Sequence, residues 1–347
     1  MKMDILPIAL GTETGLDTLV SESGKVHFGH LNGPIQSFGL EHFNYTNAMD
    51  KPAGRLAKHF HFKQFQFVSV ITPRFLIGVA IADIRYAASG FCYLYDIEAN
   101  KLVETSWLKP LSLGCTMAPS PWEGCSSLGG AGGKISMEIN AGVWQLRIAT
   151  KQISADFTLI PPTASLPMAL CNPTGYSGWT YTQKHNALGV QGSLVINQEA
   201  QDLEHALAGY DFSAGFMRRE TSWRWASING RIGGSLFGLN LAAGVNETGY
   251  NENVFWRDGE SHLLGPVHFD FTRSACEPDW QISSQDGKVS LTFSPLNKRQ
   301  ERLNLGLLKS NFRQYIGHFN GQIEDAKSQL HRLDNVLGLT EDHYALW

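Results

Sequence analysis

The segment from Trp179 to Asp270 carries the residue types in this sequence that are best suited to a chemical site. Aromatic side chains recur along it: Trp179, Tyr181, Trp223, Trp225 and Trp256. Polar and charged side chains are interleaved with them: Lys184, His185, Asp211, Arg219, Glu220, Asn240, Glu247, Glu252, Asn253 and His268. Charged groups among apolar side chains cost free energy unless they are paired. This pattern indicates a polar site inside an apolar cavity, with rim ion pairs around a tryptophan core as the alternative.

A second candidate site is formed by His59 and His61, which alternate as strand residues on one face do and would suit a metal ion. A metal site of this kind also needs a carboxylate shortly after the pair, but Lys63, Gln64 and Gln66 stand there. We therefore expect two strand histidines and no metal. Because the sequence lacks a nucleophile-elbow or phosphate-loop motif, we predict no cofactor.

Period-two alternation between turn signals predicts the elements that position these residues. Asn-Gly or Asp-Gly pairs divide strand-like runs at Asn229-Gly230, Asp258-Gly259 and Asp286-Gly287. Such pairs favour the positive φ of two-residue hairpin turns. The pattern therefore predicts an antiparallel meander in the C-terminal half.

The first half of the chain alternates in the same way, and a proline-rich stretch from Pro161 to Pro173 separates the halves. We therefore predict an all-β fold of two consecutive antiparallel barrels, at residues 1–165 and 166–347. Helical periodicity is scarce. Apolar residues between Ile323 and Leu339 predict either one amphipathic helix or an irregular tail after the second barrel.

Composition excludes several classes of protein. In 347 residues the hydrophobic share is 43% and the charged share 17%, which argues against disorder. A net charge of -4 and the lack of a Lys/Arg cluster argue against a nucleic-acid partner. No apolar run approaches the roughly 18 residues of a membrane span. Five scattered cysteines and no signal-peptide core predict free thiols in the cytoplasm.

Several segments of the sequence resemble a family of unknown function, domain-of-unknown-function family 2804. The matching pieces are Trp179–Lys184, Thr221–Ser227, Gly238–Leu241, Asn251–Trp256, Asp286–Pro295 and Gly338–Trp347. The resemblance covers nearly the whole chain. It implies no particular activity.

A more distant similarity is to two-barrel lipocalin-like proteins, which include carotenoid hydratases and tocopherol cyclase. Phe216–Glu220, followed by Trp223-x-Trp225, is similar to their Asp-Arg/His-Glu motif before a Trp-x-Trp pair, although Arg218 replaces the aspartate. The resemblance implies two lipocalin-like barrels and a cavity for a long apolar molecule.

Chemistry of that type implies roles for the charged and aromatic residues. Addition of water to an isoprenoid double bond, or its cyclisation, needs a carboxylic acid that protonates carbon and aromatic faces that stabilise a cation. The candidate acids are Asp211, Glu220 and Glu252. The candidate faces are Trp223, Trp225 and Trp256. Lys184 or Arg219 would orient the acids, because a nearby cation lowers a carboxyl pKa.

Three functions stay open on this basis: a binding protein for a lipid or isoprenoid-like molecule, an enzyme acting on such a molecule, and a carbohydrate-active protein. We predict that the cavity lies in the C-terminal half and is lined by Trp223, Trp225, Asn240, Glu252 and Trp256. The full set of expected ligand-binding residues is Lys184, Arg219, Trp223, Trp225, Asn240, Asn253, Trp256 and His268. The sequence leaves the oligomeric state open.

Overall fold

The computed structural model describes residues 15–245, 249–273 and 279–347. Almost all of the regular structure in this part is β-strand, and the long strands pair in antiparallel fashion. One sheet is nearly closed and the other forms a half-barrel. The predicted all-β fold of two lipocalin-like barrels is therefore confirmed.

The first sheet has the order β5-β4-β3-β2-β13-β11-β9-β8-β7-β6, with β10 and β12 also on β11 and β1 on β10. A short helix, α1 (Arg55–His61), precedes β2. The strands of this sheet are β1 Gly29–Leu31, β2 Phe62–Ile71, β3 Phe75–Asp83, β4 Ala87–Asp96, β5 Lys101–Pro110, β6 Gly124–Gly130, β7 Gly133–Asn140, β8 Val143–Thr150, β9 Ile153–Ile160, β10 Met168–Thr174, β11 Gly178–Ile196, β12 Glu199–Gln201 and β13 Leu207–Phe216.

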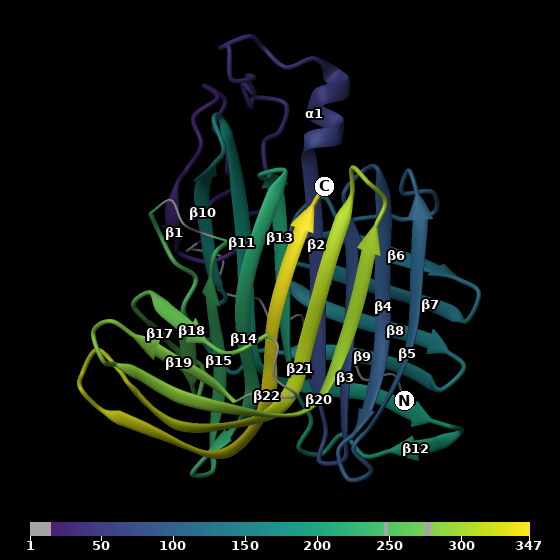
Figure 1. Cartoon of the computed structure of the whole chain (residues 1–347), viewed down its shortest axis with the longest axis vertical. Coiled ribbons are helices and arrows are strands. Elements are labelled where there is room, and N and C mark those ends of the chain that lie inside the picture. Colours follow the sequence, from purple (N-terminus) through teal and green to yellow (C-terminus); the bar gives the residue numbers. More distant parts are fainter. Residues whose placement is uncertain (1–14, 246–248, 274–278) are drawn as a thin grey trace.

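The second sheet has the order β17-β16-β15-β14-β22-β21-β20-β19-β18. Its strands are β14 Glu220–Ile232, β15 Ser235–Ala243, β16 Val254–Arg257, β17 Glu260–Leu263, β18 Val267–Asp270, β19 Trp280–Ser284, β20 Val289–Asn304, β21 Lys309–Glu324 and β22 Leu330–Leu346. In Figure 1 the strands β20, β21 and β22 overlap β2, β3 and β4 of the first sheet, and a buried apolar cluster joins Phe67 and Phe91 of that sheet to Phe312 of the second. The two sheets therefore pack face to face.

The change from one sheet to the other falls between Phe216 and Glu220, later in the chain than the expected boundary at 165/166. Strand β10 overlaps the end of the proline-rich stretch and β11 and β13 follow it, and all three belong to the first sheet. The reason is pairing: β11 pairs with β9, and β13 pairs with β2 along its whole length. A proline-rich connection thus joins strands of one sheet here.

Two of the three predicted hairpin turns are confirmed. Asp258 and Gly259 join β16 to β17 with φ of 49° and 92°, and Gly287 lies in the turn between β19 and β20. The turn predicted at Asn229-Gly230 is wrong, because both residues lie inside β14. The Asn229 amide is buried there and donates to Ser69 Oγ at 3.0 Å, while the hairpin turns at Gly233-Gly234.

Two local predictions also fail. The segment Ile323–Leu339 forms neither a helix nor an irregular tail, because it holds the end of β21, a turn and much of β22, whose strands pair with each other. His59 and His61 lie on helix α1 and not on a strand. Residues two apart on a helix do not face each other. Among the described residues no group of three or more His, Cys, Asp or Glu gathers as metal ligands would.

Apolar side chains form a separate core cluster in each sheet and two clusters between the sheets, the larger of which we call the inter-sheet cluster. The inter-sheet cluster joins Phe67, Phe91 and Tyr93 of the first sheet to Trp225 and Phe312 of the second. Because strand side chains alternate, the opposite faces of β14 and β21 contribute to the core of the half-barrel instead. No helix within the described residues is long and apolar enough to span a membrane.

Candidate functional site

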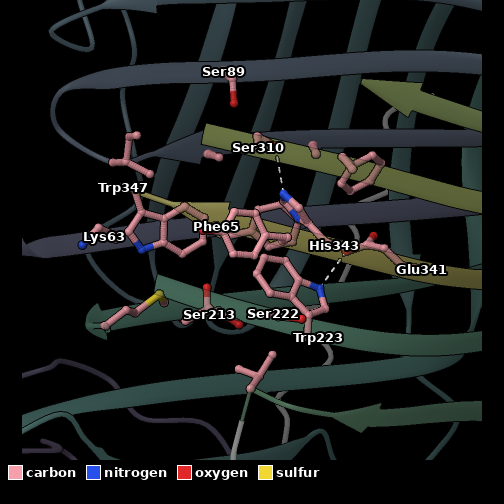
Figure 2. A pocket seen from close by; sticks show the side chains of 18 of the residues that line it. Lys63, Phe65, Ser89, Ser213, Ser222, Trp223, Ser310, Glu341, His343 and Trp347 are labelled. Carbon is pink, nitrogen blue, oxygen red and sulfur yellow. Dashed lines mark hydrogen bonds and ion pairs between the residues drawn. The ribbon is translucent and has the colours of Figure 1, made fainter. Parts of the chain in front are cut away.

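A cavity of about 490 Å³ lies between the two sheets, beside the inter-sheet cluster. Strands β2, β3, β4, β11 and β13 line it from the first sheet, and β14, β15, β20, β21 and β22 line it from the second. Aromatic side chains make up much of its wall: Phe65, Phe67, Phe91, Trp223, Trp225, Phe312, His343 and Trp347. Figure 2 shows several of these rings converging on one space.

Strand alternation explains why these rings meet. Trp223 and Trp225 are two residues apart on β14, and both line the cavity, as predicted from their spacing. Phe65 and Phe67 do the same on β2, and the rings of Phe67 and Trp225 meet edge to face with centroids 5.7 Å apart. Each sheet thus presents a pair of rings to the other.

The Glu341 carboxyl is a buried acid within the aromatic wall. Its side chain is buried and accepts hydrogen bonds from Trp223 Nε1 at 2.7 Å and from Gln314 Nε2 at 3.2 Å. Gln314 is held in turn by the Tyr93 hydroxyl, which donates to Gln314 Oε1 at 2.8 Å. Burial raises the pKa of Glu341 to about 7, although both donors favour the charged form. The carboxyl is therefore able to hold a proton near neutral pH.

His343 lies beside Glu341 on the same face of β22, as Figure 2 shows. Its Nε2 is 2.9 Å from Ser310 Oγ, and its Nδ1 is 3.9 Å from Glu341 Oε1. The imidazole also packs on Trp223, with ring centroids 4.2 Å apart. Burial lowers the pKa of His343 to about 3, so the ring is neutral at pH 7. Ser310 and His343 therefore form a hydrogen-bonded pair that lies next to Glu341 within the aromatic wall.

A second polar cluster joins Lys184, Asp211 and Glu252. Lys184 Nζ forms an ion pair with Asp211 and lies 3.4 Å from Glu252 Oε2. Thr182 donates to the same Glu252 oxygen at 3.3 Å, and Ser213 donates to Asp211 Oδ1 at 3.1 Å. Burial raises the pKa of Glu252. Burial also opposes the charge on Lys184, but the two carboxylates outweigh it and raise the lysine pKa.

Two further buried cations border the cavity. The buried Arg299 guanidinium pairs with Glu104 and Glu301, and its carbon lies 3.8 Å from the centroid of Phe91. Lys63 is also buried, and burial, together with nearby Arg219, lowers its pKa to about 8. The cavity therefore combines aromatic walls with several charged groups at separate places.

The structure brings six of the predicted site residues together. The following line the cavity: Lys184, Asp211, Glu220, Trp223, Trp225 and Glu252. Glu220 lies at its exposed margin, where it accepts a hydrogen bond from the Tyr344 hydroxyl at 2.8 Å. Asn240 does not line the cavity but supports it, since it accepts from Trp225 Nε1 at 2.7 Å and donates to the Glu252 carbonyl.

The other four predicted residues lie outside the cavity lining. Asn253 is buried and bonds the backbone of Ala242 and Gly265. Trp256 is buried elsewhere, Arg219 is exposed, and His268 is exposed on β18. Glu247, which the sequence also suggested, lies outside the described residues. The pairing of the strands and the packing of the two sheets decide which side chains reach the cavity, and a local sequence pattern does not contain this information.

Sequence reasoning placed the cavity in the C-terminal half, whereas both sheets line it. It also missed Glu341, His343 and Arg299, which contribute much of the polar wall. The signal for two of them was present: Glu341 and His343 are two apart in the closing segment of the chain, as strand residues on one face are. The sequence predicts a C-terminal tail there, whereas the segment is the end of β22.

The buried acid gives a pH-dependent stability that replacing Glu341 with glutamine should remove. The pKa of Glu341 in the folded protein is about 7, against an ordinary value of 4.5. The folded state therefore binds more protons, and its stability falls as pH rises from about 4.5 to 7. We expect Glu341→Gln to raise the free energy of unfolding by about 3 kcal/mol at pH 8 and to change it little at pH 4.5.

Urea unfolding of both proteins across this pH range measures the difference directly. Glu138→Gln is a matched control, because the Glu138 carboxylate is exposed and pairs with Arg147 on the surface. A Glu341→Gln protein whose stability difference from wild type does not vary with pH would contradict a raised pKa at this position.

The fold and the cavity define the class of protein: a two-barrel, lipocalin-like protein with an internal cavity between its sheets. A model of the family with the description "Domain of unknown function (DUF2804)" matches residues 12–347, and the chain belongs to this family. The suspected family membership is therefore confirmed. No curated protein matches the chain.

Solved structures of other proteins share the architecture. Kievitone hydratase from Nectria haematococca is 14% identical with a TM-score of 0.53, over 81% of this chain and 88% of that one. CghA with Sch210972 is 10% identical with a TM-score of 0.53, over 95% of this chain and 97% of that one. At these identities the likeness shows the fold.

Proposed function

We propose that this protein binds a mostly apolar small molecule that carries a polar group, in the cavity between its two sheets. The observation that carries the proposal is a buried carboxyl, Glu341, within a wall of aromatic rings. A cavity of about 490 Å³ falls in the size range of small-molecule sites, which are mostly apolar with a few convergent polar groups. A lipid or isoprenoid-like molecule fits such a site, because it combines a long apolar part with a polar group.

Two clusters of polar side chains are available to bind the polar group of such a ligand. The neutral Ser310–His343 pair and Glu341 lie together on one part of the wall, and the Lys184 cluster lies elsewhere on it. A carboxyl whose pKa is near 7 is able to donate a hydrogen bond to a ligand hydroxyl or carbonyl when protonated. The rings of Trp223, Trp225 and Phe91 would then bury the apolar part.

An enzyme acting on the same molecule is the second candidate, and one observation favours it. The raised pKa of Glu341 suits a general acid, because such an acid works best with a pKa near the working pH. Trp223 donates to this carboxyl and faces the cavity, where its ring would stabilise a developing cation. One protein of similar fold is named a hydratase, which agrees with acid chemistry.

Ligand titration with the Trp225→Ala variant tests binding. We expect wild type to bind geranylgeraniol or palmitic acid with a dissociation constant in the micromolar range or lower, measured by isothermal titration calorimetry. Loss of the Trp225 ring should weaken binding by about 1–3 kcal/mol, the usual effect of removing a large apolar contact. Mass analysis of recovered geranylgeraniol then separates binding from hydration, because addition of water to one of its double bonds adds the mass of one water.

Trp122→Ala is the matched control, since Trp122 is a half-buried tryptophan that does not line the cavity. It should bind like wild type. The cavity assignment would be wrong if neither ligand class bound, or if Trp225→Ala bound as tightly as Trp122→Ala while keeping its fold.

A further inference from the structure

A second pocket, of about 250 Å³, lies on the other face of β14, β21 and β22. Its side chains alternate with those of the cavity wall: Arg224 lies between Trp223 and Trp225, and Asp342 lies between Glu341 and His343. The pocket is lined by polar and charged residues throughout: Ser222, Arg224, Arg273, Asn311, Arg313, Asp342 and Tyr344.

Three arginines in this pocket share one carboxylate. Arg273 donates to Asp342 through Nε and Nη2, both at 2.8 Å. Arg313 Nη1 donates to Asp342 Oδ2 at 3.0 Å, and Arg224 Nε lies 3.4 Å from Asp342 Oδ1. Strand pairing dictates the cluster, because Asp342 is the register partner of both Arg224 and Arg313. Three guanidinium groups and one carboxylate leave two positive charges among the lining residues.

Burial makes this charge excess significant. The Asp342 side chain is 5% exposed and the Arg313 side chain 14%, while Arg224 is 28% and Arg273 50% exposed. Cations that are partly removed from water are unfavourable unless anions compensate them. Glu220 approaches through its hydrogen bond with the Tyr344 hydroxyl, but it is exposed and does not line this pocket. The lining therefore has room and charge for a further anion.

We propose that this pocket binds a phosphate group. Guanidinium forks match phosphate oxygens in bidentate geometry, and each arginine keeps N–H groups beyond those that contact Asp342. A phosphate carries close to two negative charges at pH 7, which balances the excess. The Ser222 hydroxyl supplies a further donor. This inference does not rest on the function proposed for the cavity.

The source of the phosphate group is either a free phosphate or the head of an apolar molecule. Ser222, Arg224 and Tyr344 border both the pocket and the inter-sheet cavity. A phosphate in this pocket therefore lies close to an apolar space. The experiment uses inorganic phosphate as one probe and dodecyl phosphate, below its micelle concentration, as the other.

Calorimetric titration at constant ionic strength, with chloride as the balancing anion, tests the site. Wild type should bind inorganic phosphate saturably, and Arg224→Gln should bind it at least tenfold more weakly. Arg224 is the variant of choice because Arg313 and Arg273 still compensate Asp342. The control is Arg147→Gln, a surface arginine paired with Glu138 and Asp156, which should bind like wild type.

Ser222→Asp provides a second variant if Arg224→Gln does not fold. It adds a carboxylate at a half-buried lining position and should also weaken phosphate binding at least tenfold. Tighter binding of dodecyl phosphate than of inorganic phosphate identifies an amphipathic ligand, and equal binding identifies free phosphate. The proposal is wrong if wild type binds neither probe saturably, or if the folded variants bind as wild type does.

Discussion

Replacing Lys184 with methionine is expected to lower the free energy of unfolding by about 3–5 kcal/mol. Lys184 Nζ is the shared cation of Asp211 and Glu252, and the side chain is only 5% exposed. Methionine keeps much of the apolar stem but removes the charge. Two carboxylates are then left close together in a buried place, and each loses the partner that offset its desolvation. Urea unfolding at pH 7 measures the loss.

The loss of stability caused by Lys184→Met should become smaller as pH falls. This pH dependence separates an electrostatic cause from a packing defect. Without the lysine, burial and mutual repulsion raise the pKa values of the two carboxyls in the folded state. The folded variant then binds more protons than the unfolded chain, so acidification favours folding. A packing defect would instead cost the same free energy at pH 5 and pH 7.

Lys327→Met is the matched control. Lys327 Nζ lies 3.7 Å from Glu260 Oε1, and the two side chains are 78% and 65% exposed. Exposed pairs of this kind contribute less than about 1 kcal/mol. If Lys184→Met destabilised the protein no more than Lys327→Met, the Lys184 cluster would not be the buried network described here.

Local sequence signals predicted the fold class well, because strand alternation and turn chemistry are local properties. Asp258-Gly259 turns as expected, and the long-range hydrogen bonds between Asp258 and Leu236 leave this turn in place. Asn229-Gly230 has the same signal but continues a strand. The Asn229 side chain donates to Ser69 on the other sheet and accepts from the Ala187 N–H, and both partners are distant in sequence. No local pattern contains this information.

The C-terminal segment shows a different limit. Apolar residues from Ile323 to Leu339 recur at helix-like spacing because the segment crosses from one strand to the next through a turn. The register shift between Phe319 and Gly321 also changes the pairing of β21 with β22. When two alternating strands are joined by a turn, the spacing of apolar residues across the turn can resemble that of a helix. Because Glu341 and His343 lie on β22, a prediction that lacks this strand does not place them in the site.

The candidate site was predictable as a list of residue types but only partly as a geometry. Lys184, Asp211 and Glu252 come from different parts of the chain, and the structure does bring them together. Their meeting depends on the pairing of β11 with β13 and on the packing of the second sheet against the first. Which tryptophan faces the cavity depends on the same long-range packing, and Trp256 shows this most clearly.

Trp256→Ala is expected to lower the free energy of unfolding by about 3–5 kcal/mol while leaving ligand affinity unchanged. The Trp256 ring is 1% exposed, and its Nε1 donates to the Leu166 carbonyl at 3.0 Å. It packs with Met168 and Leu170 of the first sheet, so it joins the sheets away from the cavity lining. Truncation therefore leaves a void and an unpaired carbonyl.

The contrast with Trp223 makes this expectation decisive for the placement of the site. Trp223 lines the cavity and donates to Glu341, and it is only partly buried. Trp223→Ala should weaken ligand binding more than it lowers stability, and Trp256→Ala should do the reverse. Denaturant unfolding and calorimetric titration of both variants measure the two quantities independently. A Trp256→Ala protein that folds but binds apolar ligands at least tenfold more weakly would place the site at Trp256, because a ring outside the cavity has no direct contact with a ligand inside it.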